Sequence, residues 1–261
     1  MSRLLPFLIA GLVALCVAAP LAAAGAPLRV TLDPGHGGSD PGAQVEGLNE
    51  SDLVLDFAKR LRDVLTDSGR FEVSLTREAD ERVALDRRVT RARAAGAEVF
   101  ISLHADALAE GDGHASGVTV YTLSASDTDD ADRRLKERHG RTDLLTGVDL
   151  RGAEDDVAQA LIDLSRRDTL PRGKALADAI VSSFGAGELA VNSRPHRHGG
   201  FAVLHAADIP SVLIELGFLS SARDRRRLTS EDWLDGAAQA IRDGLILWAD
   251  EDRLRTAGFR Q

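Results

Sequence analysis

The chain has almost no cysteine and no excess of positive charge. Cys16 is the single cysteine among 261 residues, and it falls within an apolar leader at the N-terminus. Once that leader is removed, no thiol remains for a disulfide bond, a nucleophile or a metal site, so any metal must be held by His, Asp and Glu. The formal net charge is −9. A protein this acidic is a poor candidate for binding nucleic acid or an anionic membrane surface.

The leader has the pattern of a secretory signal peptide. Arg3 precedes an uncharged apolar run over residues 4–19, and Ala22-Ala23-Ala24 follows as a small-x-small cleavage signature. The run is too short for a spanning helix with a stop-transfer pattern, so we expect no membrane span in the mature protein. We predict that residues 1–24 are removed. A lipid-anchored start at Cys16 is the alternative, which the bulky Leu15 disfavours.

Strand-like and helix-like segments alternate along residues 25–261, and no internal repeat is present. Repeated strand–helix units are typical of an α/β fold, in which helices flank a mostly parallel central sheet. The length suits a single domain with one sizeable core. The apolar pattern predicts strands at 28–32, 71–75, 99–103, 117–122 and 210–215, and helices that begin at Asn49, at Asp80 or Glu81, at Arg172 and at Asp232.

Two stretches depart from this alternation. Residues 124–172 are polar and charged and lack strand signals, so we predict a helical insertion there. Residues 185–200, rich in Gly, Arg and His, are predicted to be a loop. Two groups of arginines are predicted to lie on solvated helix faces that could meet an anionic polymer: Arg87, Arg88, Arg91 and Arg93, and Arg225, Arg226 and Arg227.

Two histidines directly follow predicted strands. His36 lies in a Gly-rich turn after residues 28–32, and His104 ends the run 99–103. The carboxyl ends of parallel strands meet at one edge of a sheet, so both histidines are expected there. Glu50, in the first turn of the next helix, can point back across the turn. Each residue alone could be structural, but two imidazoles and a carboxylate together form a zinc shell with an open fourth position, where a water has its pKa lowered to roughly 7.

A zinc site of this kind also needs a group that moves protons. Glu215 ends the apolar strand 210–215, and an apolar setting favours a carboxyl that can take and return a proton. It is predicted to accept a proton from the water and to deliver it to the leaving amine. Asp33, Asp40 and Asp106 flank the predicted ligands and could orient them, although turn chemistry explains each of them equally well.

Four separated blocks resemble, in the same order, the zinc-dependent N-acetylmuramoyl-L-alanine amidases of the cell-division type, which cleave bacterial peptidoglycan. The resemblance extends from about Leu28 to Trp248, nearly the whole mature chain. The blocks are Leu32-Asp33-Pro34-Gly35-His36-Gly37-Gly38, Asn49-Glu50, residues 101–107, and residues 200–204 followed by 209–218.

This resemblance implies that zinc is bound by His36, Glu50 and His104, with Glu215 as the catalytic acid/base. It implies that the enzyme hydrolyses the amide between the lactyl group of N-acetylmuramic acid and L-alanine of the stem peptide. The expected role is daughter-cell separation or wall remodelling. The implied location is the periplasm, which agrees with the signal peptide.

In the cell-division amidases, a regulatory segment covers the zinc site until an activator protein displaces it. Residues 142–150 resemble the core of that segment, and residues 153–167 resemble the helix that follows. Relatives have a glutamate that can occupy the open metal position, whereas this chain has His139 near that point, with Glu137 close by. The resemblance implies that residues 136–168 cover the zinc; a disordered charged loop is the alternative.

Other readings of the site remain open. A different zinc peptidase or deacetylase of the cell wall could use the same shell, and a non-catalytic wall-binding or activator protein could keep the fold. The basic cluster Arg194-Pro195-His196-Arg197-His198 could bind carboxylates of a stem peptide, or it could be a solvated loop. His114 and His205 are interpreted as surface or structural residues.

Overall fold

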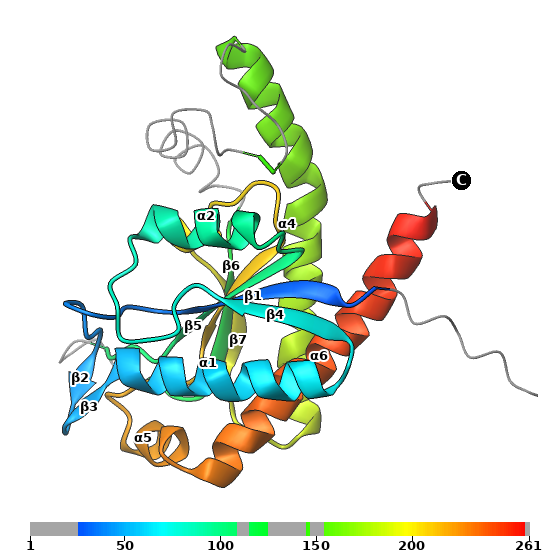
Figure 1. The fold of residues 1–261 in the computed structure, drawn as a ribbon. Coiled ribbons are helices and arrows are strands. Elements are labelled where there is room, and N and C mark those ends of the chain that lie inside the picture. Colours follow the sequence, from blue (N-terminus) through cyan, green and yellow to red (C-terminus); the bar gives the residue numbers. More distant parts are fainter. Residues whose placement is uncertain (1–25, 109–114, 125–144, 147–153, 259–261) are drawn as a thin grey trace, which may run out of the picture.

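A six-stranded sheet forms the centre of the structure, a computed structural model that describes residues 26–108, 115–124, 145–146 and 154–258. The strand order is β4-β1-β5-β8-β6-β7, and every pair is parallel except β6 with β8 (Figure 1). This confirms the predicted α/β fold. The strands are β1 (Leu28–Pro34), β4 (Phe71–Leu75), β5 (Val99–His104), β6 (Val118–Thr122), β7 (Val191–His198) and β8 (Ser211–Glu215).

Helices cover both faces of the sheet. One apolar cluster joins the sheet to α1 (Glu50–Asp67), α4 (Asp155–Ala186) and α6 (Glu231–Gly258). A second cluster joins the other face to α2 (Leu85–Ala94) and the short helix η2 (Ala202–Leu204). The remaining elements are a small hairpin of β2 (Gln44–Val45) and β3 (Leu48–Asn49), and helix α5 (Ala222–Leu228).

The strand register brings three chain segments together at one edge. Pro34 at the end of β1 is paired with Leu103 of β5, and His104 is paired with Glu215 at the end of β8. Because these strands are parallel, the turn after β1, the end of β5 and the end of β8 lie side by side. The predicted site residues therefore meet at this edge.

The prediction of a loop over residues 185–200 is wrong for its second half. Residues 191–198 form β7, which lies at the edge of the sheet and is paired with β6 through an irregular register. This segment contains Pro195 and is mostly polar, so it lacks the alternating apolar pattern by which strands are predicted. An edge strand tolerates both, since one side of it faces solvent and needs no partner for every N–H group.

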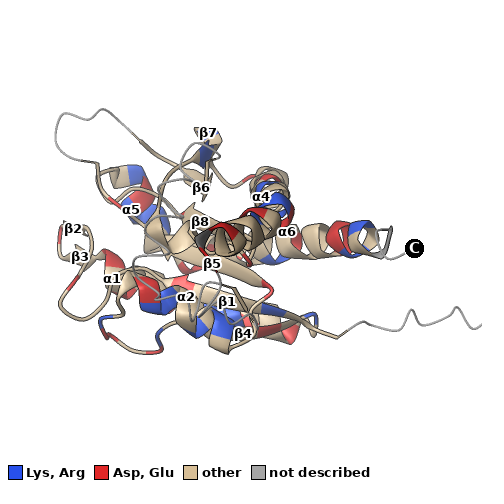
Figure 2. Ribbon diagram, turned by 90° about the horizontal axis from the view of Figure 1, so that it is seen from above, with Lys and Arg blue, Asp and Glu red and all other residues tan. Residues whose placement is uncertain are grey.

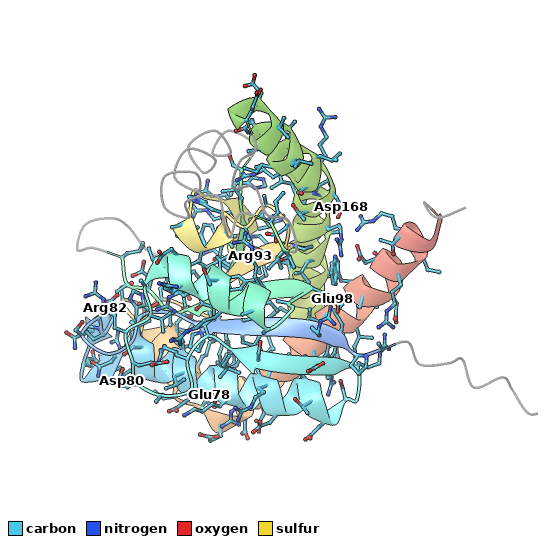
Figure 3. The ribbon with its side chains drawn as sticks, turned by 45° about the horizontal axis from the view of Figure 1, so that its top comes forward. Glu78, Asp80, Arg82, Arg93, Glu98 and Asp168 are labelled. Carbon is cyan, nitrogen blue, oxygen red and sulfur yellow. The ribbon has the colours of Figure 1, made fainter. Side chains whose placement is uncertain are left out.

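Two helix boundaries also differ from the prediction. Helix α2 begins at Leu85 rather than at Asp80 or Glu81, because the preceding loop packs on the His36 turn: the Gly38 N–H donates to Asp80 Oδ1 at 2.6 Å. Figure 3 shows Asp80 and Arg82 in this loop. Helix α4 runs without a break from residue 155 to 186, so no helix begins at Arg172, and Pro171 lies inside the helix.

Two of the arginines predicted to be solvated are buried. Arg88 and Arg93 of α2 are 3% and 7% exposed and are paired with Asp33 and Asp208. Burial alone would raise the pKa of Asp208, but the hydrogen bonds and charge of Arg93 outweigh burial and hold it below its ordinary value. The apolar face of α2 includes Val89 and Ala92, and the helical period places Arg88 and Arg93 beside them.

The predicted signal peptide, residues 1–24, lies outside the described residues. So does most of the predicted insertion, including Glu137 and His139; His114 lies outside as well. His205 is buried, in keeping with a structural residue. Among the described helices, none combines the length and the apolarity that a membrane span requires.

Candidate metal and catalytic site

The turn after β1 presents His36 in an unusual backbone conformation. Its φ of 58° lies in the left-handed region, which non-glycine residues seldom adopt, and such strain is commonly found at functional sites. Two buried arginines hold the turn by its carbonyl groups. Arg88 Nη2 donates to the His36 carbonyl at 2.7 Å, and Arg77 Nη2 donates to the Gly35 carbonyl at 2.8 Å.

Backbone hydrogen bonds hold the Glu50 carboxylate in place within the site. Glu50 begins α1 and is 0% exposed, and each of its carboxylate oxygens accepts a backbone hydrogen bond. Oε2 accepts from the Ala43 N–H and Oε1 accepts from the Ala105 N–H, both at 3.0 Å. These bonds orient the carboxylate between the turn after β1 and the end of β5.

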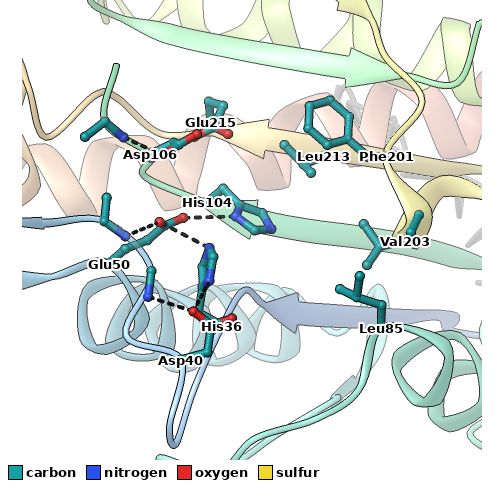
Figure 4. Close-up of a pocket in the computed structure, with 14 residues that line it drawn as sticks. His36, Asp40, Glu50, Leu85, His104, Asp106, Phe201, Val203, Leu213 and Glu215 are labelled. Carbon is teal, nitrogen blue, oxygen red and sulfur yellow. Dashed lines mark hydrogen bonds and ion pairs between the residues drawn. The ribbon is translucent and has the colours of Figure 1, made fainter. Parts of the chain in front are cut away.

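The two imidazoles meet at this carboxylate (Figure 4). His104 Nδ1 lies 2.9 Å from Glu50 Oε1, and His36 Nε2 lies 3.2 Å from Glu50 Oε2. One donor atom from each of the three residues lies within 4.8 Å of the others, so the group could hold a metal ion. Two histidines and a carboxylate match the donor set of catalytic zinc.

Two glycines make room for these side chains. A Cβ added at Gly35 would lie 2.4 Å from Cε1 of His104, and one added at Gly42 would lie 2.6 Å from Oε2 of Glu50. Gly42 also has a φ of +67°, a conformation that glycine adopts without strain. The glycines of the sequence motif therefore serve the site as well as the turn.

The charges of the three residues are strongly coupled. The hydrogen bond with Glu50 raises the pKa of His36 to about 9. Burial opposes ionisation of His104, but Glu50 and nearby carboxylates raise its pKa. Burial likewise opposes ionisation of Glu50, yet its hydrogen bonds with the two histidines hold its pKa well below the ordinary value. The cluster stabilises positive charge, as a cation site should.

Glu215 lies on the same edge of the sheet, next to His104 in the strand register, and is 5% exposed. Burial raises its pKa to about 7. The Asp106 N–H donates to Oε2 of Glu215 at 3.1 Å and so fixes one carboxyl oxygen. A carboxyl group with a pKa near neutrality is suited to both accepting and returning a proton.

The three flanking aspartates have different surroundings. Asp40 Oδ1 lies 3.1 Å from His36 Nδ1, in position to orient that ring. Asp33 is buried and contacts Arg88, Ser102 and Thr76, so it acts on the His36 turn through Arg88. The carboxylate of Asp106 instead accepts from the neighbouring Ala107 N–H, and the backbone N–H of Asp106 donates to Glu215.

A pocket of about 590 Å³ opens over the site, and no sequence pattern predicted its apolar wall. The wall lies opposite the charged groups in Figure 4 and consists of Leu85, Phe201, Val203 and Leu213. Phe201 lies in residues 200–204, part of one of the blocks that resemble the amidases, but the sequence suggested no role for it. Two residues of this wall, Leu85 and Phe201, are 50% and 37% exposed, and together they form an apolar surface that a ligand could cover.

Comparison with curated proteins shows a consistent set of relatives. The chain is 34% identical to the N-acetylmuramoyl-L-alanine amidase AmiC of Neisseria meningitidis over 83% of its length and 51% of that protein. It is 33% identical to AmiC of Escherichia coli, over 84% of its own length and 52% of AmiC. With AmiA of Escherichia coli K12 it shares 33% identity, over 86% of this chain and 78% of AmiA. The chain spans about half the length of the AmiC proteins.

Solved structures have the same fold. The amidase AmiC2 of Nostoc punctiforme matches with a TM-score of 0.58 and 27% identity, covering 85% of this chain and 97% of that one. Ami1 of Mycobacterium smegmatis matches with a TM-score of 0.61 and 19% identity, covering 87% and 98%. The family model described as N-acetylmuramoyl-L-alanine amidase, Amidase_3, matches residues 30–246. The chain belongs to this amidase family.

Proposed function

We propose that this protein is a zinc-dependent N-acetylmuramoyl-L-alanine amidase that hydrolyses the bond between N-acetylmuramic acid and the stem peptide of peptidoglycan. One observation carries the proposal: two histidines and a buried glutamate converge beside a second buried carboxyl, in a chain of this family. A non-catalytic wall-binding protein has no need of Glu215 beside that cluster.

The residues divide the chemistry among them. His36, Glu50 and His104 would hold zinc, and the bound ion would supply a Lewis acid for activating water and polarising the scissile carbonyl. Backbone N–H groups keep the Glu50 carboxylate in one orientation. Glu215 takes the proton that the attacking water loses and delivers it to the nitrogen of the leaving L-alanine, while the Asp106 N–H holds its other oxygen.

Product masses test the reaction and the bond. Purified protein is incubated with defined muropeptides, and the expected products are the free sugar with its lactyl carboxylate and an intact stem peptide that begins with L-alanine. Removal of zinc by a chelator should abolish cleavage, and added zinc should restore it. Cleavage within the stem peptide indicates a peptidase, and loss of acetate indicates a deacetylase; either result contradicts the proposal.

We also propose that the mature enzyme works in the periplasm after removal of residues 1–24, and that residues 136–168 restrain its activity until an activator binds. Contacts of two described residues of the predicted insertion support its attachment to the rest of the protein. Leu145 packs against Ala158, Ile162 and Ala207, and the Thr146 N–H and hydroxyl both donate to Asp208 at 2.7 Å. One structural neighbour, the amidase CwlD, is known in complex with the lipoprotein GerS.

A deletion tests this restraint. Residues 155–168 belong to α4, whose Ala158 and Ile162 are buried, so the deletion should be confined to residues 125–144, replaced by a short Gly-Ser linker. The expected result is faster release of stem peptide with unchanged thermal stability. Equal rates for the deleted and the full-length protein would show that the segment exerts no restraint.

A further inference from the structure

A row of side chains leads away from the pocket across three strands. Leu213 of β8 lies in the pocket wall and is paired with Tyr121 of β6, which is in turn paired with Arg197 of β7. Paired residues on neighbouring strands point to the same face of a sheet. Leu213 shares this face with Glu215, because residues two apart on a strand point the same way. Arg197 therefore lies on the same face as Glu215.

Tyr121 and Phe201 connect the pocket to this arginine. The two rings meet edge to face, with centroids 5.1 Å apart. The Arg197 guanidinium also contacts Tyr121: it lies 5.5 Å from the ring centroid, and its Nη1 donates to the tyrosine hydroxyl at 3.2 Å. These contacts hold the guanidinium in place at the end of an aromatic surface.

Arg197 differs from the buried arginines in having no acidic partner. Arg88 and Arg93 contact Asp33 and Asp208, whereas no carboxylate of the described residues lies within ion-pair distance of Arg197. The side chain is exposed. A guanidinium that is held in place and has no carboxylate beside it is well suited to bind one from a ligand, because its planar fork matches carboxylate geometry.

The position of Glu215 indicates which part of the substrate passes along this row. This step rests on the proposed function, in which Glu215 gives its proton to the leaving amine. The stem peptide carries that amine, so it continues from Glu215 over Leu213 and Phe201. Two strand spacings across the sheet and two residues along β8 separate Glu215 from Arg197, roughly 12 Å in all. An extended peptide covers that distance in about three residues.

We propose that Arg197 binds a carboxylate on the second or third residue of the stem peptide and thereby selects acidic peptides. Between the zinc site and this arginine, the peptide backbone lies against the aromatic pair Tyr121 and Phe201. The arginine is a specificity residue and takes no part in the proton transfers.

Two muramoyl tripeptides test this, one with carboxylates on its second and third residues and one with carboxamides there. The wild type should cleave the carboxylate form with a kcat/KM about tenfold higher, mainly through KM, since the contact is made in both ground and transition states. Arg197→Ala should cleave both forms equally, and Arg197→Lys should retain part of the preference. Arg194→Ala is the matched control: it removes an exposed arginine from the same strand and should leave the preference intact.

The affinity of each variant for the two free tripeptides, measured by calorimetry, separates this proposal from the proposed reaction. If the wild type cleaves neither muramoyl tripeptide, the reaction is wrong, but a loss of carboxylate preference in Arg197→Ala binding still supports the subsite. If Arg197→Ala keeps the full preference in binding and in kcat/KM, the subsite is wrong whatever the reaction.

Discussion

At the scale of single residues, the site depends on the glycines around it as much as on the side chains that could bind the metal. Gly35 leaves space that the His104 ring occupies, and a methyl group at this position would lie 2.4 Å from that ring. The ring must then move, and metal sites respond strongly to the orientation of their ligands.

We therefore predict that Gly35→Ala lowers zinc affinity about 10- to 100-fold, as loss of an orienting contact does at other metal sites. Zinc affinity can be measured by competition with a chromophoric chelator. Gly185→Ala is the control, since Gly185 lies in α4 with open space around its Cα and its substitution should leave the affinity unchanged. Equal affinities for the two variants would contradict the packing argument.

The pH dependence of the reaction follows from Glu215. The residue must be ionised to accept a proton, and burial raises its pKa to about 7. Below that pH the carboxyl is already protonated, so kcat/KM should fall about tenfold per pH unit on the acid side. The pH profile of hydrolysis checks this. A profile that stays flat from pH 5 to pH 8 would show that Glu215 is not the base.

At the scale of the elements, helix α2 serves the site without contributing a proposed metal ligand. Its Arg88 is buried, is paired with Asp33 and donates to the carbonyl of His36. Removing one partner of a buried ion pair leaves the other charge uncompensated, at a cost of about 3–5 kcal/mol.

We predict that Arg88→Met lowers the free energy of unfolding by about that amount and weakens zinc binding, because the His36 turn loses a hydrogen bond. Arg87→Met is the matched control, since Arg87 is on the same helix and exposed, and we expect a change within about 0.5 kcal/mol. Urea unfolding of both variants makes the comparison. Similar losses of unfolding free energy in the two variants would contradict a specific stabilising role for the Arg88 contacts.

How much the sequence predicted also differs between elements. Strands β1, β5 and β8 are buried and strongly apolar, so their pattern located them and placed His36, His104 and Glu215 at their ends. Strand β7 is polar and contains Pro195, and only its pairing with β6 makes it a strand. The pairing of β7 with β6 brings Arg197 next to Tyr121, which also contacts Phe201. No pattern in the local sequence predicts these contacts.

At the scale of the whole molecule, the parallel sheet brings the functional groups together from distant parts of the chain. The groups at positions 36, 50, 104 and 215 come from four elements or their connecting turns, and strand register alone places the last two side by side. Acidic and basic residues are interspersed along α1, whereas α5 is mainly basic (Figure 2).

The central claim is that His36, Glu50 and His104 hold zinc and that Glu215 moves the proton. The most direct test measures bound zinc and stem-peptide release together in Glu50→Gln and Glu215→Gln. We predict that Glu50→Gln loses both zinc and activity. Glu215→Gln should keep one zinc per chain and lose at least about 100-fold in kcat. Full activity in Glu215→Gln, or full zinc content in Glu50→Gln, would contradict the account.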